Sequence, residues 1–179
     1  LQSPRQLEDY VDYLSDAIRF FSDAFSEVPV ASLLVGGGTP SLYPLPWLKE
    51  LFATLQNNFQ IDPEPEITIE SNPTDITEER LDAWRECGIN RLSIGVQCLD
   101  DAVLLKLNRR QRTTDVERTL RIAPKYFDNI SVDFILGLPG GLFVVRSVES
   151  GAFKDESGAG TNQPPGLAST FRAFFYCRG

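Results

Sequence analysis

The sequence contains no histidine and no methionine, and its three cysteines, Cys87, Cys98 and Cys177, lie far apart. Without histidine there is no histidine-based catalytic triad and no histidine-ligated metal site. No two cysteines form a CxxC or similar pair, so the residues themselves predict neither a zinc site nor a local iron–sulfur site. Because methionine is missing even at position 1, we expect this chain to be part of a longer translation product.

Long apolar runs and an excess of positive charge are also missing. No run approaches the roughly 20 apolar residues that a membrane span needs, and no signal-peptide pattern opens the chain. The net charge of −8 makes nucleic acid a poor partner. What remains is an ordinary globular composition, 42% hydrophobic over 179 residues, which is enough for one domain with a core.

Helical and strand patterns alternate over the first 140 residues. Helical spacing of apolar residues predicts helices over 4–25, 46–58, 78–87, 101–107 and 114–123. Short apolar runs predict strands over 30–35, 66–71, 91–97 and 130–136, with a loop over 62–65. The run over 30–35 is expected to be a buried parallel strand. The expected fold class is α/β with a parallel sheet, either open or most of a partial barrel.

The alternation of helical and strand patterns ends at residue 140. The segment 141–179 has no sustained period and contains a Pro-Pro pair among many glycines and serines. We therefore expect one domain over 1–140 and an irregular, poorly ordered tail over 141–179, in which the aromatic residues near the end could pack locally.

Polar residues follow the predicted strands at their carboxyl ends, where parallel α/β sheets bind ligands. Gly36-Gly37-Gly38-Thr39-Pro40 follows the first strand, Glu70 and Asn72 end the second, Gln97 ends the third, and Asp133 lies in the fourth. The glycines let the backbone approach a ligand closely, although the loop is neither a Walker loop nor a dinucleotide fingerprint. Together these positions predict a ligand-binding rim.

Each candidate also has a plain structural interpretation. The glycines suit a tight turn, Glu70 an exposed strand end, and Gln97 a capping amide. Arg109 suits a ligand carboxylate, but it also fits a solvated basic cluster with its neighbours. Asp133, inside an apolar strand, needs either a ligand hydroxyl or an internal salt bridge as its partner.

Five segments, taken in order and spacing, resemble one known family. They read GGGTPSL, EITIESNPTDIT, GINRLSIGVQ, LNRRQ and NISVDFILGLPG. They resemble the oxygen-independent coproporphyrinogen III oxidase and haem chaperone family (HemN/HemW-like), a branch of the radical S-adenosylmethionine (SAM) proteins, over about residues 5–140. The segment ESNP is more similar to the haem chaperone branch than to the oxidase branch.

The resemblance implies a partial (βα) barrel that binds SAM. Gly37, Gly38 and Thr39 match the SAM-binding loop, and Glu70, Gln97, Arg109 and Asp133 match further SAM-contacting positions. Arg109 would then pair with the methionine carboxylate, and Asp133 or Glu70 with ribose hydroxyls or the amino group. The resemblance assigns no catalytic residue of this chain.

Two departures from the family limit what this chain is expected to do. The family's CxxxCxxC motif, which holds a 4Fe-4S cluster, is expected upstream of residue 1, so the cluster ligands are absent from this chain. The family sequence also continues past GLPG with a further helix and strand, which the tail replaces. We therefore expect a fragment of a radical SAM protein of haem metabolism, whose activity as an enzyme is open.

The alternatives are a non-catalytic haem-binding or interaction module and a truncated, inactive product. The expected ligands are SAM and a porphyrin or haem, and a haem-accepting protein is the macromolecular partner of the chaperone branch. A cytoplasmic or mitochondrial location fits the family, with any targeting region outside this chain.

Overall fold

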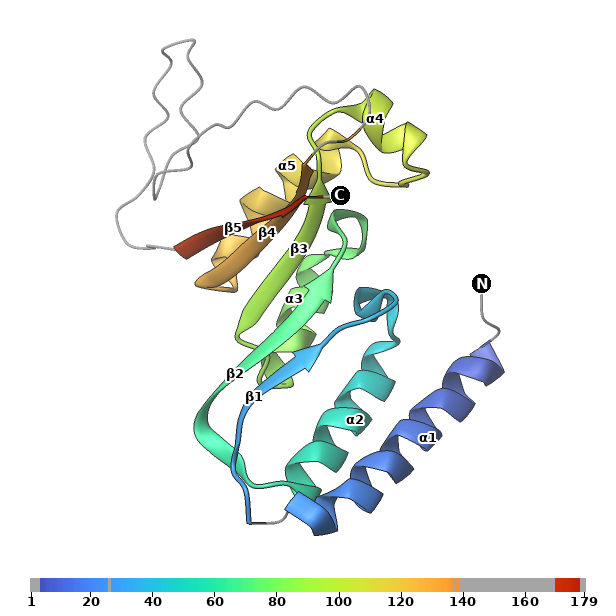
Figure 1. The fold of residues 1–179 in the computed structure, drawn as a ribbon, viewed down its shortest axis with the longest axis vertical. Helices are drawn as coiled ribbons and strands as arrows, with labels where there is room; N and C mark the ends of the chain where they lie inside the picture. Colours follow the sequence, from blue (N-terminus) through green and yellow to red (C-terminus); the bar gives the residue numbers. More distant parts are fainter. Residues whose placement is uncertain (1–3, 26, 137, 139–169, 178–179) are drawn as a thin grey trace.

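The computed structural model describes residues 4–25, 27–136, 138 and 170–177. Over these residues five parallel strands form one sheet in the order β1-β2-β3-β4-β5 (Figure 1). The strands are β1 (Val30–Val35), β2 (Ile61–Ser71), β3 (Arg91–Gln97), β4 (Asn129–Leu136) and β5 (Thr170–Cys177). Because all of them run the same way, their carboxyl ends lie along one edge of the sheet.

Helices connect the first four strands, as the alternating pattern predicts. The connecting helices are α2 (Leu45–Asn58), α3 (Glu78–Glu86), α4 (Asp101–Lys106) and α5 (Thr113–Ile122), while α1 (Pro4–Ser22) precedes β1. Local sequence explains where α3 starts and stops: Thr77 accepts a hydrogen bond from the Arg80 N–H, and Gly88 adopts a φ of +86° after the helix. The predicted α/β fold with parallel strands is confirmed.

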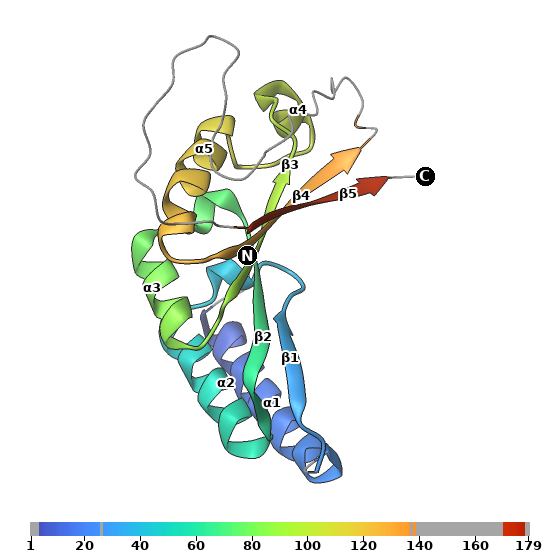
Figure 2. The same cartoon turned by 90° about the vertical axis from the view of Figure 1, so that its left-hand side faces the viewer.

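One face of the sheet packs against the helices and forms the core. Figure 2 shows α2, α3 and α5 on this side of the strands. Alternate residues of β3, namely Leu92, Ile94 and Val96, are fully buried in a cluster with Trp84 of α3. The residues between them point to the opposite face, because successive strand residues alternate sides. Polar side chains of the strands are thereby directed away from the core.

The prediction of a loop over residues 62–65 is wrong, since these residues belong to β2. The pairing of β1 with β2 jumps from Val30↔Ile61 to Ser32↔Glu66, so residues 62–65 form a bulge in an extended chain. A bulge tolerates the two prolines of this segment, which cannot donate to a strand ladder. The prolines that predicted a loop therefore correspond to a bulge in strand β2.

Strand β1 matches the predicted range but not the predicted burial. The side chain of Leu34 is 66% exposed, and Ala31 and Ser32 are exposed as well. Within the described residues β1 pairs only with β2, so it lies at the edge of the sheet. An apolar run alone does not distinguish a central strand from an edge strand.

Strand β5 lies inside the segment predicted to be irregular. Residues 170–177 pair in parallel with β4 along its whole length, from Asn129↔Thr170 to Leu136↔Cys177. The expectation of an irregular tail therefore does not hold for these residues, whose aromatic sequence TFRAFFYC favours a strand. The other residues of the tail lie outside the described part of the chain.

Candidate functional site

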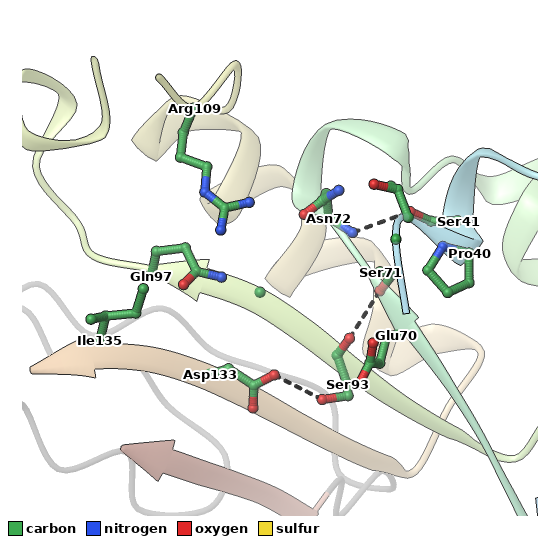
Figure 3. Close-up of a pocket in the computed structure, with 13 residues that line it drawn as sticks. Pro40, Ser41, Glu70, Ser71, Asn72, Ser93, Gln97, Arg109, Asp133 and Ile135 are labelled. Carbon is green, nitrogen blue, oxygen red and sulfur yellow. Dashed lines mark hydrogen bonds between the residues drawn. The ribbon is translucent and has the colours of Figure 1, made fainter. Parts of the chain in front are cut away.

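A pocket of about 430 Å³ lies where the carboxyl ends of β2, β3 and β4 meet the loop that follows β1. Figure 3 shows polar side chains from these elements pointing toward it. The pocket is lined by Gly38, Thr39, Pro40, Ser41, Glu70, Ser71, Asn72, Ser93, Gly95, Gln97, Arg109, Asp133 and Ile135. Its charged groups are two carboxylates and one guanidinium, which suits a polar ligand that carries charge of both signs.

The glycine-rich loop touches the Glu70 carboxylate directly. The backbone N–H of Gly37 donates to Glu70 Oε2 at 3.1 Å. A Cβ atom on Gly36 would lie 3.1 Å from the carboxyl carbon of Glu70, closer than most such contacts, so glycine permits this approach. Gly37 and Gly38 have φ values of +79° and +54°, which glycine adopts without strain. The loop thus brings backbone groups and a carboxylate together at the end of the sheet.

A buried hydroxyl fixes this loop against the end of β2. Ser41, which is fully buried, donates to Asp75 Oδ2 at 2.8 Å and accepts from the Asn72 N–H at 3.3 Å. The Arg80 guanidinium donates to the carbonyl oxygens of Ser41 and Tyr43 at 2.7 and 3.1 Å. These bonds join residues more than 30 positions apart, so they position one wall of the pocket.

We expect Ser41→Ala to lower the free energy of unfolding by about 1–3 kcal/mol, because it removes two hydrogen bonds to partly buried groups of Asp75 and Asn72. Ser15→Ala is the matched control, since Ser15 is also buried but its hydroxyl has no partner among the described residues. The control should lower the free energy of unfolding by less than Ser41→Ala does, because the Ser15 hydroxyl has no hydrogen bond to lose among the described residues. Urea unfolding followed by circular dichroism measures both, and equal effects would show that the Ser41 bonds are not stabilising.

Strand β3 ends in an irregular backbone that turns Gln97 into the pocket. Its register with β4 shifts between Gly95 and Gln97, and Gln97 has a φ of +67°, which is unusual for a residue with a side chain. A Cβ atom on Gly95 would lie 2.8 Å from Gln97 Nε2, so glycine makes room for the Gln97 amide. The buried amide of Gln111 holds this backbone by donating to the carbonyls of Gly95 and Val96 at 3.1 and 2.7 Å.

Arg109 reaches the pocket from the segment between α4 and α5. Asn108 reverses the chain with a φ of +54°, and the Arg109 N–H then donates to the Leu104 carbonyl at 2.9 Å. In Figure 3 the guanidinium of Arg109 points toward the space between Gln97 and Asn72. The side chain is exposed, which leaves its donors accessible to a ligand.

Asp133 lies on β4 next to Ser93 of β3, whose hydroxyl donates to Asp133 Oδ2 at 3.0 Å (Figure 3). Burial raises the pKa of Asp133 above its ordinary value, and the nearby charge of Glu70 raises this pKa further. The Ser93 hydrogen bond and the charge of Arg91 act against that increase in pKa. Within the described part of the chain no cation lies within 4.0 Å of Asp133, so the alternative of an internal salt bridge is not supported.

The structure brings together all the residues that the sequence predicts for the rim. Eight of the predicted positions line the pocket directly, namely Gly38, Thr39, Pro40, Glu70, Asn72, Gln97, Arg109 and Asp133. Gly37 contributes through its hydrogen bond to Glu70. Whether each one contacts a ligand stays a prediction.

Sequence reasoning missed three contributors to the site. Ser93 could have been found, because it alternates with Leu92 and Ile94 in β3 and must face away from the core. Ser41 and Gln111 carry no such signal, since their roles depend on backbone groups far away in the sequence.

The described residues offer no set of ligands for an iron–sulfur cluster or another metal ion. No group of three or more histidine, cysteine, aspartate or glutamate side chains is arranged for metal binding among them. Cys87 is buried and Cys98 partly buried, and burial raises the pKa of both thiols, which disfavours the thiolate form that binds metals. Likewise, no helix in the described ranges is long and apolar enough to cross a membrane.

Comparisons with known proteins agree with this geometry. Residues 4–141 match the family model described as the Radical SAM superfamily. The chain is 37% identical over 112 residues to a protein of Synechocystis named "Heme chaperone HemW". It is 41% identical over 111 residues to a Mus musculus protein named "Radical S-adenosyl methionine domain-containing protein 1, mitochondrial".

A solved structure shows the same arrangement of strands and helices. It is the coproporphyrinogen III oxidase (HemN) from Escherichia coli, described as a radical SAM enzyme, with 33% identity and a TM-score of 0.73. The similarity covers 78% of this chain and 32% of that chain. The two relatives match over 62% of this chain and over 27% and 25% of their own lengths, so this chain spans only a part of what they contain.

Proposed function

This chain belongs to the radical SAM superfamily, and from that premise we propose that its pocket binds SAM as part of a protein of haem metabolism. The observation that carries the proposal is the convergence of the glycine-rich loop, Glu70, Gln97, Arg109 and Asp133 on one pocket. These groups come from five successive segments, namely the loop after β1, the ends of β2 and β3, the loop between α4 and α5, and strand β4. They lie at the edge of the sheet where α/β proteins bind ligands.

The charges of the pocket fit the groups of SAM. SAM carries a carboxylate, an ammonium group, a sulfonium and two ribose hydroxyls. The Arg109 guanidinium would hold the carboxylate, since its planar fork donates two parallel hydrogen bonds. Glu70 and Asp133 would accept from the hydroxyls or the ammonium group, and the backbone at Gly38 and Thr39 would lie against the ligand. Gln97 has both a donor and an acceptor to fix its orientation.

SAM, when bound, supplies the radical chemistry of the superfamily, which needs an electron from an iron–sulfur cluster. The described residues do not fit that cluster, because neither Cys87 nor Cys98 has ligand partners. The part played by this chain is therefore to bind and orient SAM and to keep the carboxylates close to it. Electron transfer is outside what these residues do.

The names of the relatives support a role of the whole protein in haem metabolism, either as a coproporphyrinogen III oxidase or as a haem chaperone. One relative is named as mitochondrial, which suggests the same compartment for a eukaryotic protein of this kind. A haem-binding module without SAM is less well supported. The sequence has no histidine or methionine to bind haem iron, and burial raises the pKa of Cys98 and so disfavours its thiolate.

Titration calorimetry of the whole chain with SAM tests whether the pocket binds SAM and whether the Asp133 carboxylate interacts with it. Burial raises the pKa of this carboxyl, so in the free pocket it keeps its proton to a higher pH than an exposed aspartate does. A ligand hydroxyl or ammonium group stabilises the ionised form and lowers the pKa, so SAM should displace a proton. The affinity for SAM should rise with pH between the lower pKa of Asp133 in the complex and its higher pKa in the free pocket. Above both pKa values the affinity should be constant. Buffers of different ionisation enthalpy report the released proton.

Asp133→Asn should abolish the proton release and weaken SAM binding by about tenfold. Asp128→Asn is the matched control, because Asp128 is exposed and outside the pocket, and it should change neither quantity. Absence of saturable SAM binding by the folded chain contradicts the proposed function. Proton release that persists in Asp133→Asn would instead assign the titration to another group.

A further inference from the structure

Four cationic residues lie close together in the sequence, between the last residue of α4 and the residue before α5. Lys106, Arg109, Arg110 and Arg112 fall within residues 106–112, here called the basic segment, and all four are exposed. No carboxylate lies within 4.0 Å of any of them in the described part of the chain. Elsewhere, by contrast, five cations have such partners, namely Arg19, Lys49, Arg91, Arg118 and Lys125.

The carboxylates near the basic segment bond to backbone groups rather than to these cations. Asp100 accepts from two N–H groups in the first turn of α4, at 2.8 and 3.1 Å. Asp101 accepts from the Thr113 N–H at 2.8 Å, and Asp115 accepts from the Arg112 N–H at 2.8 Å. These acids shape the ends of two helices, and the four cations have no acidic side chain within 4.0 Å in the described ranges. The positive charge is therefore directed to solvent in a chain whose net charge is −8.

The backbone of the basic segment is held firmly, so its cations have a defined position. Gln111 is only 3% exposed and bonds to two carbonyls of β3, whereas Arg110 and Arg112 on either side are exposed. Arg112 has extended backbone angles of −117° and 162°. In an extended segment alternate residues face opposite sides, which puts Arg110 and Arg112 on the outer side. Arg109 is the member that lines the pocket.

We propose that Lys106, Arg110 and Arg112 form a docking surface for an acidic segment of a partner protein, next to the mouth of the SAM pocket. The proposal does not depend on SAM binding. An acidic partner would be repelled by most of this acidic chain and attracted here, so the basic segment would also set its orientation. Nucleic acid fits less well, because its continuous line of phosphates would meet the surrounding negative charge.

Fluorescence anisotropy with a labelled oligo-glutamate peptide tests this surface in the whole chain. The peptide should bind weakly at low ionic strength and dissociate as salt is added, since the contacts are exposed. The triple variant Lys106→Gln, Arg110→Gln, Arg112→Gln should weaken the peptide affinity by roughly tenfold. Its affinity for SAM and its melting temperature should remain those of the unchanged chain, because none of the three side chains lines the pocket.

The matched control is Arg85→Gln, Arg121→Gln, Lys125→Gln, which removes the same charge from exposed positions outside the basic segment. It should bind the peptide within about twofold of the unchanged chain. Equal weakening by both triple variants would mean that only net charge matters and would overturn the proposal. So would the lack of any peptide binding at low salt, or tighter binding of a thymidine oligonucleotide of the same charge, which would point to nucleic acid.

Discussion

Arg109→Ala is expected to weaken SAM binding by about 10- to 100-fold, the largest effect of any single change in the pocket. Among the described residues that line the pocket, the guanidinium is the only cationic group. A charge-assisted hydrogen bond to a carboxylate contributes about 1.5–3 kcal/mol, and the two parallel bonds of a guanidinium fork also fix the orientation of the ligand. Calorimetric titration of SAM, at the pH where Asp133 is ionised, measures the change.

Two further variants distinguish the charge of Arg109 from the geometry of its guanidinium, and both from the effect of removing any arginine. Arg109→Lys keeps the charge but loses the planar fork, so its affinity should lie between those of the unchanged chain and Arg109→Ala. Arg121→Ala removes an exposed arginine of α5 outside the pocket and should leave SAM binding unchanged. If Arg109→Ala binds SAM like the unchanged chain, Arg109 belongs to the solvated basic cluster instead, which is the alternative that the sequence leaves open.

Trp84→Ala is expected to lower the free energy of unfolding by about 3–5 kcal/mol, as removal of a large buried aromatic side chain does. Trp84 is fully buried in the core between α3 and the sheet. Many domains of this size are stable by only about 5–15 kcal/mol, so the variant should be partly unfolded at moderate temperature. Urea unfolding, followed by both fluorescence and circular dichroism, measures the loss.

Trp47→Ala and Trp84→Phe are the controls for this prediction. Trp47, the other tryptophan, is only half-buried on α2, so its removal should cost less than Trp84→Ala. Trp84→Phe keeps an aromatic ring in the core and removes an indole N–H that has no partner among the described residues, so it should cost less than Trp84→Ala. A loss in Trp84→Ala no greater than that in Trp47→Ala would show that the core does not depend on this side chain.

The sequence alone was sufficient for the order of helices and strands as far as β4 and for most of the pocket, but it did not predict β5. Periodicity is a local property, and the residues that bury one face of β3 or α5 are visible without any knowledge of their partners. The convergence of Glu70, Gln97 and Asp133 also followed from the sequence. They end or lie within successive parallel strands, and such strands share one edge where their carboxyl ends meet.

Only the tertiary structure decided the features that depend on contacts between distant residues. The prolines near residue 63 read as a loop, yet β1 pairs on both sides of them and makes them a bulge. Ser41 and Asp75 are 34 residues apart, and their hydrogen bond depends on how the loop after β1 meets the end of β2. Gln111 has no local partner and becomes a support of the pocket only because the bulge in β3 turns two carbonyls toward it. Hydrogen bonds of this kind require a distance and a direction in space, and a residue pattern along the chain specifies neither.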